Sequence, residues 1–179
     1  ANNIHPGFDL FDLRPILQGQ KFSPVGIGGM DFFPDGRLAI ATWGGFKSSK
    51  GKVFVLSSVT GSNVNDIQVL ELASGLREPM GLKIVDGAIY VVEKTRLAKI
   101  TDRDSNGVGK ITTVYNGWGF DEAFEVRQGT WHAYGLEYVD EHFYITLSND
   151  RVFWSGVLGK GAKDRGALIK IPKNGGGHQ

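Results

Sequence analysis

The sequence predicts an all-β protein organised as about three four-stranded blades of a six- or seven-bladed β-propeller. Three observations favour this class. Glycine supplies 26 of the 179 residues, about twice its usual share of roughly 7%, which indicates many tight turns between short strands. A pattern of two strands joined by a turn occurs three times, and no long stretch has helical periodicity.

The repeat is visible when three segments are aligned on their glycines. Each copy has a glycine, a large apolar residue, a short strand, a turn that starts at aspartate and a second strand. The turn residues Asp35, Asp86 and Asp140 recur about every 50 residues, as in repeat architectures. The copies read GGMDFFPDGRLAIATW from Gly28, PMGLKIVDGAIYVVEK from Pro79 and AYGLEYVDEHFYITLS from Ala133.

Further strands complete each unit. A third strand is predicted in GKVFVLS (51–57), TRLAKITD (95–102) and GALIKIPK (166–173), and a fourth in IQVLEL (67–72) and KITTVY (110–115). Four antiparallel strands per repeat are typical of a propeller blade. We therefore divide the chain into a lead segment (1–27) and blades at 28–76, 77–128 and 129–179, the last incomplete at its end. Since propellers close with about four to eight blades, the remaining blades are expected from the same precursor or another chain.

The residues just before the first strand of each blade are the first candidate site. Counting back three from Gly135 reaches His132, and the same count from Gly81 reaches Glu78. These register-equivalent residues are expected to converge at one mouth of the central channel. A histidine beside a carboxylate is suited to act as a base or to hold a metal. The alternative is that Glu78 caps a loop amide and His132 is a solvated channel residue.

Aromatic and basic residues near the same ends extend the site. Trp43, Trp118 and Trp131 offer flat faces to a sugar or a quinone, or else pack between blades. Arg165 is placed to reach an anionic ligand, or else forms a surface ion pair. Other residues expected near the ends of the inner strands are Glu93, Lys94 and Ser148.

An acidic loop in the second blade predicts a structural Ca²⁺ site. Asp102, Asp104 and Asn106 have the D-x-D-x-N-G spacing of a calcium loop, and the seventh position, which supplies a carbonyl, is Val108. Thr113 stands where such loops carry a bidentate glutamate. The alternative is a turn rich in aspartate and asparagine that holds no ion.

Composition excludes several classes of function and partner. The net charge of +1 gives no reason to expect a nucleic acid partner, and the absence of cysteine excludes disulfides and thiolate metal sites. No apolar run reaches the roughly 20 residues of a membrane helix. Because the chain begins at Ala1 without a methionine, we expect a processed protein, secreted or periplasmic.

The chain resembles the glucose/sorbosone dehydrogenase superfamily of β-propellers, including its membrane-bound-dehydrogenase type. The resemblance lies in the three aligned segments and in two longer stretches, LREPMGLKIVDGAIYVVEKTRLAKITDRDSNG and DRGALIKIPKNGG. This resemblance covers nearly the whole chain after Gly28. In HAYGL, His132 matches the general base of members that use pyrroloquinoline quinone. The resemblance thus implies a quinone-dependent sugar or alcohol oxidoreductase with His132 as its base, and Arg165 is a partial match to its quinone contacts. The register of the repeat adds Glu78 beside the base, and the aromatic residues add Trp131 as a flat surface for the quinone.

Two other functions remain open for the same fold, because fold alone does not determine chemistry. The first is a non-catalytic propeller that binds a glycan or a protein. The second is a lyase that resembles the aldos-2-ulose dehydratases and acts through a metal at the hub.

Overall fold

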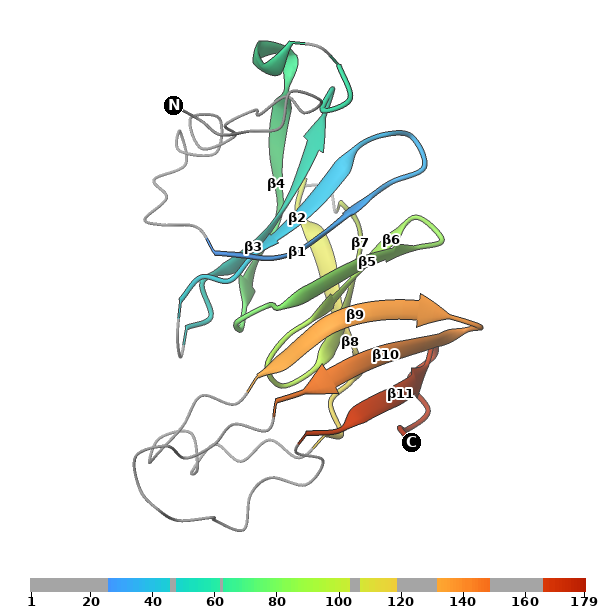
Figure 1. Cartoon of the computed structure of the whole chain (residues 1–179). Coiled ribbons are helices and arrows are strands. Elements are labelled where there is room, and N and C mark those ends of the chain that lie inside the picture. The colour runs from blue at the N-terminus through green and yellow to red at the C-terminus, as the bar shows by residue number, and fades with distance from the viewer. Residues whose placement is uncertain (1–25, 46–47, 62, 104–106, 119–131, 149–165) are drawn as a thin grey trace, which may run out of the picture.

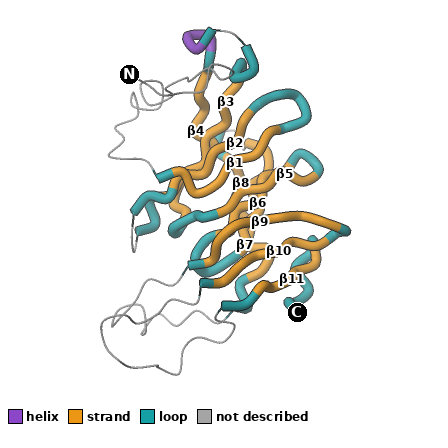
Figure 2. The backbone as a smooth tube through the Cα atoms, in the orientation of Figure 1, coloured by secondary structure: helices purple, strands orange, loops and turns teal. Residues whose placement is uncertain are grey.

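The described part of the chain is an all-β structure. A computed structural model describes residues 26–45, 48–61, 63–103, 107–118, 132–148 and 166–179, which form three antiparallel sheets of four, four and three strands (Figures 1 and 2). A single turn of 3-10 helix, η1 (Val64–Asp66), is the one helical element within these residues. Most of the predicted lead segment lies outside them, as does the segment 121–128, which we interpreted as a loop.

Each sheet is a simple meander in which neighbours in sequence are neighbours in space. The first sheet contains β1 (Ile27–Phe32), β2 (Leu38–Thr42), β3 (Gly51–Ser57) and β4 (Gln68–Leu76). The second contains β5 (Gly81–Val85), β6 (Ala88–Val92), β7 (Leu97–Arg103) and β8 (Gly109–Tyr115). The third contains β9 (Ala133–Val139), β10 (His142–Leu147) and β11 (Leu168–Pro172). Every strand expected from the repeat is therefore present, although β4 is longer than predicted.

The aspartate turns join the first two strands of each sheet. In the second sheet, Asp86 and Gly87 have φ angles of 49° and 76°, the left-handed pair that a two-residue hairpin with the strand twist requires. In the third sheet Asp140 and Glu141 adopt the same conformation, at 48° and 59°, without a glycine. The turn geometry is thus the same in the two sheets, although the third sheet has glutamate where the second has glycine, the residue that adopts a positive φ most easily.

The first strands of the three sheets, β1, β5 and β9, lie side by side, so that the sheets stack in chain order (Figure 1). Their backbones approach very closely. A Cβ added to Gly81 would lie 2.8 Å from the carbonyl carbon of Gly135, and one added to Gly29 would lie 2.5 Å from the nitrogen of Leu82. The backbone amide of Gly135 also donates to the carbonyl of Met80 at 3.0 Å. The repeated glycine therefore permits contact between neighbouring inner strands.

Apolar side chains fill the space between successive sheets. Between the second and third sheets, Phe143 packs on Tyr90 with ring centroids 4.5 Å apart, and Tyr138 lies 4.9 Å from Phe143. Between the first and second sheets, the core is mainly aliphatic, with Ala41 and Val91 among its members, and includes one aromatic residue, Phe33. A further buried cluster on the first sheet consists of Leu38, Ile40, Phe54 and Leu56. Burial on both faces explains why strands such as AIYVV lack polar alternation.

The last residues of the chain return along the free edge of β11. The amide of Gln179 donates to the carbonyl of Lys170 at 3.0 Å, and the amide of Lys170 donates to Gln179 at 3.1 Å. His178 also hydrogen-bonds through Nδ1 to the hydroxyl of Tyr115, on β8 of the second sheet. These residues thus take the place next to β11 where the repeat predicts a fourth strand.

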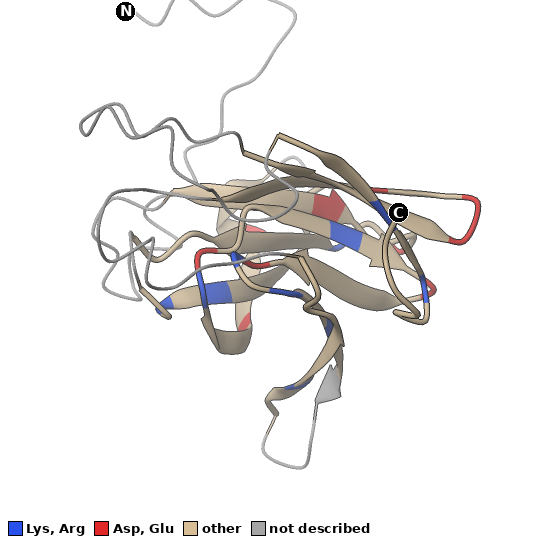
Figure 3. Ribbon diagram, turned by 90° about the horizontal axis from the view of Figure 1, so that it is seen from below, with Lys and Arg blue, Asp and Glu red and all other residues tan. Residues whose placement is uncertain are grey.

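Charged residues are interspersed over the described sheets and turns (Figure 3). Lys52, for example, lies on β3 and pairs with Glu71 on β4 at 2.7 Å. No helix among the described residues has the length and apolar character needed to cross a membrane.

Candidate functional site

Glu78 and His132 meet at the junction of the second and third sheets. Glu78 lies in the connection between β4 and β5, and His132 directly precedes β9. Oε2 of Glu78 is 3.1 Å from Nδ1 of His132, and the two side chains are 0% and 5% exposed. This distance is that of an ion pair. Two side chains from successive repeats thus converge at equivalent positions, three residues before Gly81 and Gly135.

Backbone hydrogen bonds hold both residues in place. Glu78 has a φ of 46°, an uncommon left-handed conformation for a residue other than glycine. On either side of Glu78, the carbonyl of Arg77 accepts from the amide of Lys94, and the amide of Met80 donates to the carbonyl of Val92. The turn that carries Glu78 is therefore fixed to the end of β6 and the residues that follow.

His132 is fixed to the opposite strand through Ser148. The amide of His132 donates to Oγ of Ser148 at 3.0 Å, and the amide of Ser148 donates to the carbonyl of His132 at 2.9 Å. The imidazole also lies 5.5 Å from the ring of Tyr134. Because the amide and the carbonyl of His132 are both hydrogen-bonded to Ser148, the backbone that positions the imidazole against Glu78 is fixed.

Lys94 completes a buried cluster of three ionisable side chains. Its Nζ lies 3.0 Å from Oε2 of Glu78, the same oxygen that contacts His132, and both side chains are 0% exposed. Burying a single charge is costly, and a partner of opposite charge offsets much of this cost. The carbonyl of Lys94 accepts a hydrogen bond from Nε1 of Trp118 at 3.0 Å. We call Glu78, Lys94 and His132 the junction cluster.

Glu93, adjacent to Lys94, ties the same connection together. Its Oε2 accepts from the amide of Arg77 at 2.6 Å, and its Oε1 accepts from Nε of Arg96 at 2.6 Å. Glu93 is also buried. The segment between β6 and β7 therefore holds Arg77, at the start of the turn that carries Glu78, through both Glu93 and the backbone amide of Lys94.

The arrangement is suited to proton transfer. A carboxylate beside Nδ1 favours the neutral tautomer with its proton on Nδ1, which leaves Nε2 as the basic nitrogen. Lys94 supplies a positive charge next to the same carboxylate. Among the described residues, no three histidine, aspartate or glutamate side chains are grouped closely enough to hold a metal ion.

The other predicted site residues have different outcomes. Trp131, Arg165, Asp104 and Asn106 lie outside the described residues, and of Asp102 only the backbone, in β7, is described. Two described positions flank the acidic loop. Val108 is exposed, and Gly107 has a φ of 82°, which suits a sharp turn. The calcium site stays a prediction.

The tryptophans differ from one another in their surroundings. Trp118 is buried and lies 6.1 Å from the ring of Tyr115, so its faces belong to the packing between strands. Trp43 is partly buried, and its amide donates to the carbonyl of Gly26. Of the two interpretations considered for Trp118, packing is the one that the structure supports.

Sequence reasoning missed the role of Lys94 as the partner of Glu78. It placed Lys94 near the end of an inner strand but did not pair it. A signal was available, because the charged pair Glu93–Lys94 follows directly after the apolar strand AIYVV. Charged residues that continue a buried strand need partners, and Glu78 lies in the neighbouring turn.

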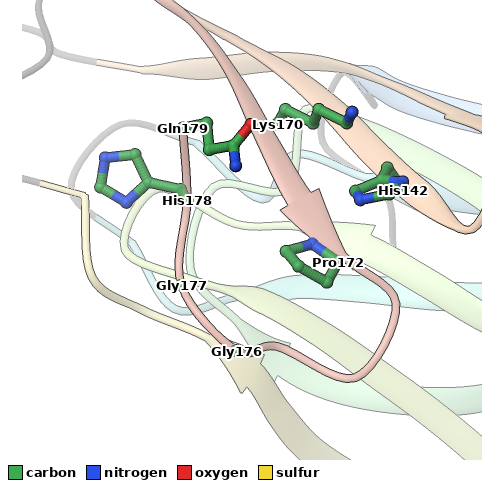
Figure 4. A pocket seen from close by; sticks show the side chains of 7 residues that line it. All are labelled: His142, Lys170, Pro172, Gly176, Gly177, His178 and Gln179. Atoms are coloured by element: carbon green, nitrogen blue, oxygen red, sulfur yellow. The ribbon is translucent and has the colours of Figure 1, made fainter.

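A small cavity lies elsewhere on the third sheet (Figure 4). It has a volume of about 180 Å³ and is lined by His142, Lys170, Pro172, Gly176, Gly177, His178 and Gln179. Its walls come from β10, β11 and the returning end of the chain, so it shares no residue with the junction cluster.

Comparison with known proteins adds no assignment, since no family model and no curated protein match the chain.

Proposed function

We propose that the three sheets are consecutive blades of a β-propeller, with β1, β5 and β9 lining its hub. The meander order within each sheet, the adjacency of the first strands and the repeated glycine contacts support this proposal. Further sheets of the same repeat, from the same precursor or another chain, would then pack against both ends of the stack.

The exposed side of β1, at one end of the stack, supports this proposal. Met30 occupies the repeat position of Leu82 and Leu136, which are only 4% and 6% exposed because each faces the preceding sheet. Met30 itself is 63% exposed. The side chain of Asp31 points the other way, toward the second sheet, where it accepts from the amide of Ile84 at 2.9 Å. The exposed side of β1 thus carries the apolar residue expected at a blade-to-blade contact.

The other end supports it through a repeated cross-strand pair. In the second sheet Tyr90 is paired with Lys99, and Phe143 of the third sheet covers Tyr90. In the third sheet Tyr144 is paired with Lys170 in the same register. The outward side of the third sheet therefore presents the same two residue types as the surface on which that sheet itself packs.

We propose that this hub binds a small sugar or alcohol and that His132 acts as the general base of its oxidation. The observation that carries the proposal is the buried 3.1 Å contact between Glu78 and His132. His132 would accept the hydroxyl proton at Nε2, since Nδ1 is against Glu78. The proton would be taken as the carbinol carbon loses its hydride and becomes a carbonyl.

A quinone such as pyrroloquinoline quinone would supply the hydride acceptor when bound. The described residues fit only the proton-accepting half of this chemistry. Lys94 is a cation at the junction, but it is buried and paired with Glu78 rather than presented to an anionic ligand. The predicted quinone contacts, Arg165 and Trp131, would have to supply the charge and the flat surface.

Reconstitution tests the proposed function. The protein is loaded with pyrroloquinoline quinone and Ca²⁺, and reduction of a redox dye is followed with aldoses and simple alcohols. We expect turnover that falls at least about 100-fold in His132→Gln, the usual contribution of a general base. His142→Gln, on β10 and outside the junction cluster, serves as the matched control and should keep full turnover.

The failure of this assay also discriminates between functions. If the wild-type protein reduces no dye with any sugar or alcohol, or if His132→Gln turns over as fast as the wild type, the assignment of His132 as the base is wrong. Dehydration of an oxidised sugar without dye reduction would favour the lyase. Binding of a glycan or a protein without turnover would favour the non-catalytic propeller.

A further inference from the structure

Lys94 and His132 contact the same oxygen of Glu78, so the charge of Lys94 acts directly on the imidazole. The two contacts are 3.0 Å and 3.1 Å long. Nζ of Lys94 and Nδ1 of His132 must therefore lie within the combined length of these contacts. At such a separation in a buried site, a neighbouring charge shifts the pKa of a titratable group by about one to three units. An opposite charge favours the charged form of the group, and a like charge disfavours it.

The effects of the two charges on His132 are opposite. Glu78 alone would favour the imidazolium form, because an adjacent carboxylate stabilises a positive charge. A histidine protonated in this way at neutral pH could not accept a proton. Lys94 disfavours the imidazolium by direct repulsion and by engaging the carboxylate. Burial disfavours it as well, because a charged ring loses its hydration.

Glu93 and Arg96, next to the cluster, form their own ion pair. On the connection between β6 and β7, Glu93 is held by Arg96 and by the amide of Arg77. On β9 the neighbour of the imidazole is the ring of Tyr134, and after β10 the hydroxyl of Ser148, which carries no charge, accepts from the backbone amide of His132. Removing Lys94 therefore removes one positive charge next to His132 while the Glu93–Arg96 pair remains.

We infer that Lys94 is a positioning residue, which fixes the Glu78 carboxylate and keeps His132 unprotonated, and so able to accept a proton, at neutral pH. This inference rests on the proposed role of His132 as a base, but its test does not require turnover. The relevant quantity is the midpoint of the His132 titration, which NMR of the imidazole ring protons reports. The resonance is assigned among the four histidines by its loss in His132→Gln.

The first comparison is between the wild type, Lys94→Met and Lys94→Arg. Methionine keeps most of the length of the side chain and removes the charge. We expect the midpoint of His132 to rise by about one pH unit or more in Lys94→Met and to return toward the wild-type value in Lys94→Arg. An unchanged or lowered midpoint in Lys94→Met would overturn the inference.

A second comparison keeps the test decisive if Lys94→Met does not fold, since that variant leaves Glu78 buried without its lysine. Glu78→Gln removes the carboxylate, and Glu78→Gln combined with Lys94→Met removes both charges. The midpoint should be higher in the double variant than in Glu78→Gln alone, because only the double variant lacks the lysine. Equal midpoints in these two proteins would contradict a direct effect of Lys94.

The two proposals fail in distinguishable ways. If the midpoints follow the expected order but the reconstituted protein reduces no dye, the oxidation chemistry is wrong and the role of Lys94 stands. If dye is reduced through His132 but the midpoints do not depend on Lys94, the role of Lys94 is wrong and the base remains.

Discussion

At the scale of single residues, the structure places some of its charges where water is excluded. Glu78 and Lys94 are fully buried, whereas the pair Lys52–Glu71 on the first sheet leaves about a third of each side chain exposed. These two pairs have similar distances but very different surroundings. A partly exposed pair contributes little to stability, whereas removing one member of a buried pair leaves an uncompensated charge.

This difference predicts unequal costs for matched substitutions. Glu78→Gln should reduce the free energy of unfolding by about 3 kcal/mol or more, because Lys94 stays buried without a carboxylate. Glu71→Gln, the control, should cost no more than about 1 kcal/mol. Urea unfolding of the two variants measures both values. Equal costs would mean that the junction pair is solvated in solution.

The register of the repeat predicted that His132 and Glu78 occupy equivalent positions, and the structure brings them into contact. The catalytic role of either residue stays a prediction. The charged residues after AIYVV indicate that Lys94 needs a buried partner, but they do not identify Glu78 as that partner, because the contact also depends on the left-handed backbone of Glu78, at a φ of 46°. That conformation is unusual for glutamate, and the adjacent sequence does not indicate it.

At the scale of elements, the repeat reflects contacts between strands as well as turns. The aspartate turns and the short apolar runs on either side of them allowed the strands to be predicted from local chemistry. The repeated glycine, by contrast, is explained by a contact with the neighbouring sheet and not by its own strand or turn. Gly81 faces the backbone of Gly135 on the neighbouring sheet, a contact between residues far apart in sequence.

Replacing this glycine tests the close approach of the inner strands. In Gly81→Ala the new methyl group would lie 2.7 Å from Cγ1 of Val92 and 2.8 Å from the carbonyl carbon of Gly135, so the Val92 side chain must shift and β5 must move away from β9. We expect a loss of about 1–3 kcal/mol in the free energy of unfolding, typical of overpacking. In Gly61→Ala, the control, the nearest atom lies at 3.4 Å, and the change should stay within about 0.5 kcal/mol. A neutral Gly81→Ala would contradict the packing of β5 against β9.

A cluster of turn residues joins the second and third sheets and predicts a pH dependence. Lys173, which follows β11, contacts Asp86 in one turn and Glu141 in the other. The Tyr138 hydroxyl and the Lys173 ammonium hold the pKa of Glu141 below its ordinary value, and Asp86 and Glu141 raise the pKa of Lys173. A carboxyl group with a lowered pKa stabilises the fold above its unfolded pKa, and this contribution is lost as the pH falls through the folded value.

We therefore expect acidification to destabilise the wild type more than Glu141→Gln. Thermal unfolding followed between pH 6 and pH 3 measures the difference, and the remaining carboxyl groups are common to both proteins. Because the cluster is on the surface, the effect should be small and should weaken in salt. Equal sensitivity to acid in the two proteins would show that Glu141 does not contribute to the loss of stability at low pH.

At the scale of the whole molecule, the described sheets form a stack with two unlike ends. One end exposes Met30 and Phe32 of β1, and the other exposes Leu168 of β11 beside the Tyr144–Lys170 pair. The all-β class and the three sheets could be predicted from the repeat. Whether such sheets close into a ring, and with how many members, could not be predicted, because closure depends on angles between sheets that local sequence does not encode.

Equivalent substitutions at an end and within the stack test this view. Leu82→Ala, between two sheets, should reduce the free energy of unfolding by about 2–5 kcal/mol, as for a buried leucine. Met30→Ala, at the same repeat position on the open end, should change it by less than about 0.5 kcal/mol. Calorimetry of the dilute protein compares them. A large cost for Met30→Ala would show that another sheet already covers β1 in solution.

The contact between Glu78 and His132 is the claim on which the proposed chemistry depends. A double-mutant cycle of Glu78→Gln and His132→Gln, followed by urea unfolding at neutral pH, measures their interaction directly. We expect a coupling free energy of about 1 kcal/mol or more, as for side chains in contact. Additivity within about 0.3 kcal/mol would mean that the two side chains do not interact, and it would contradict the account.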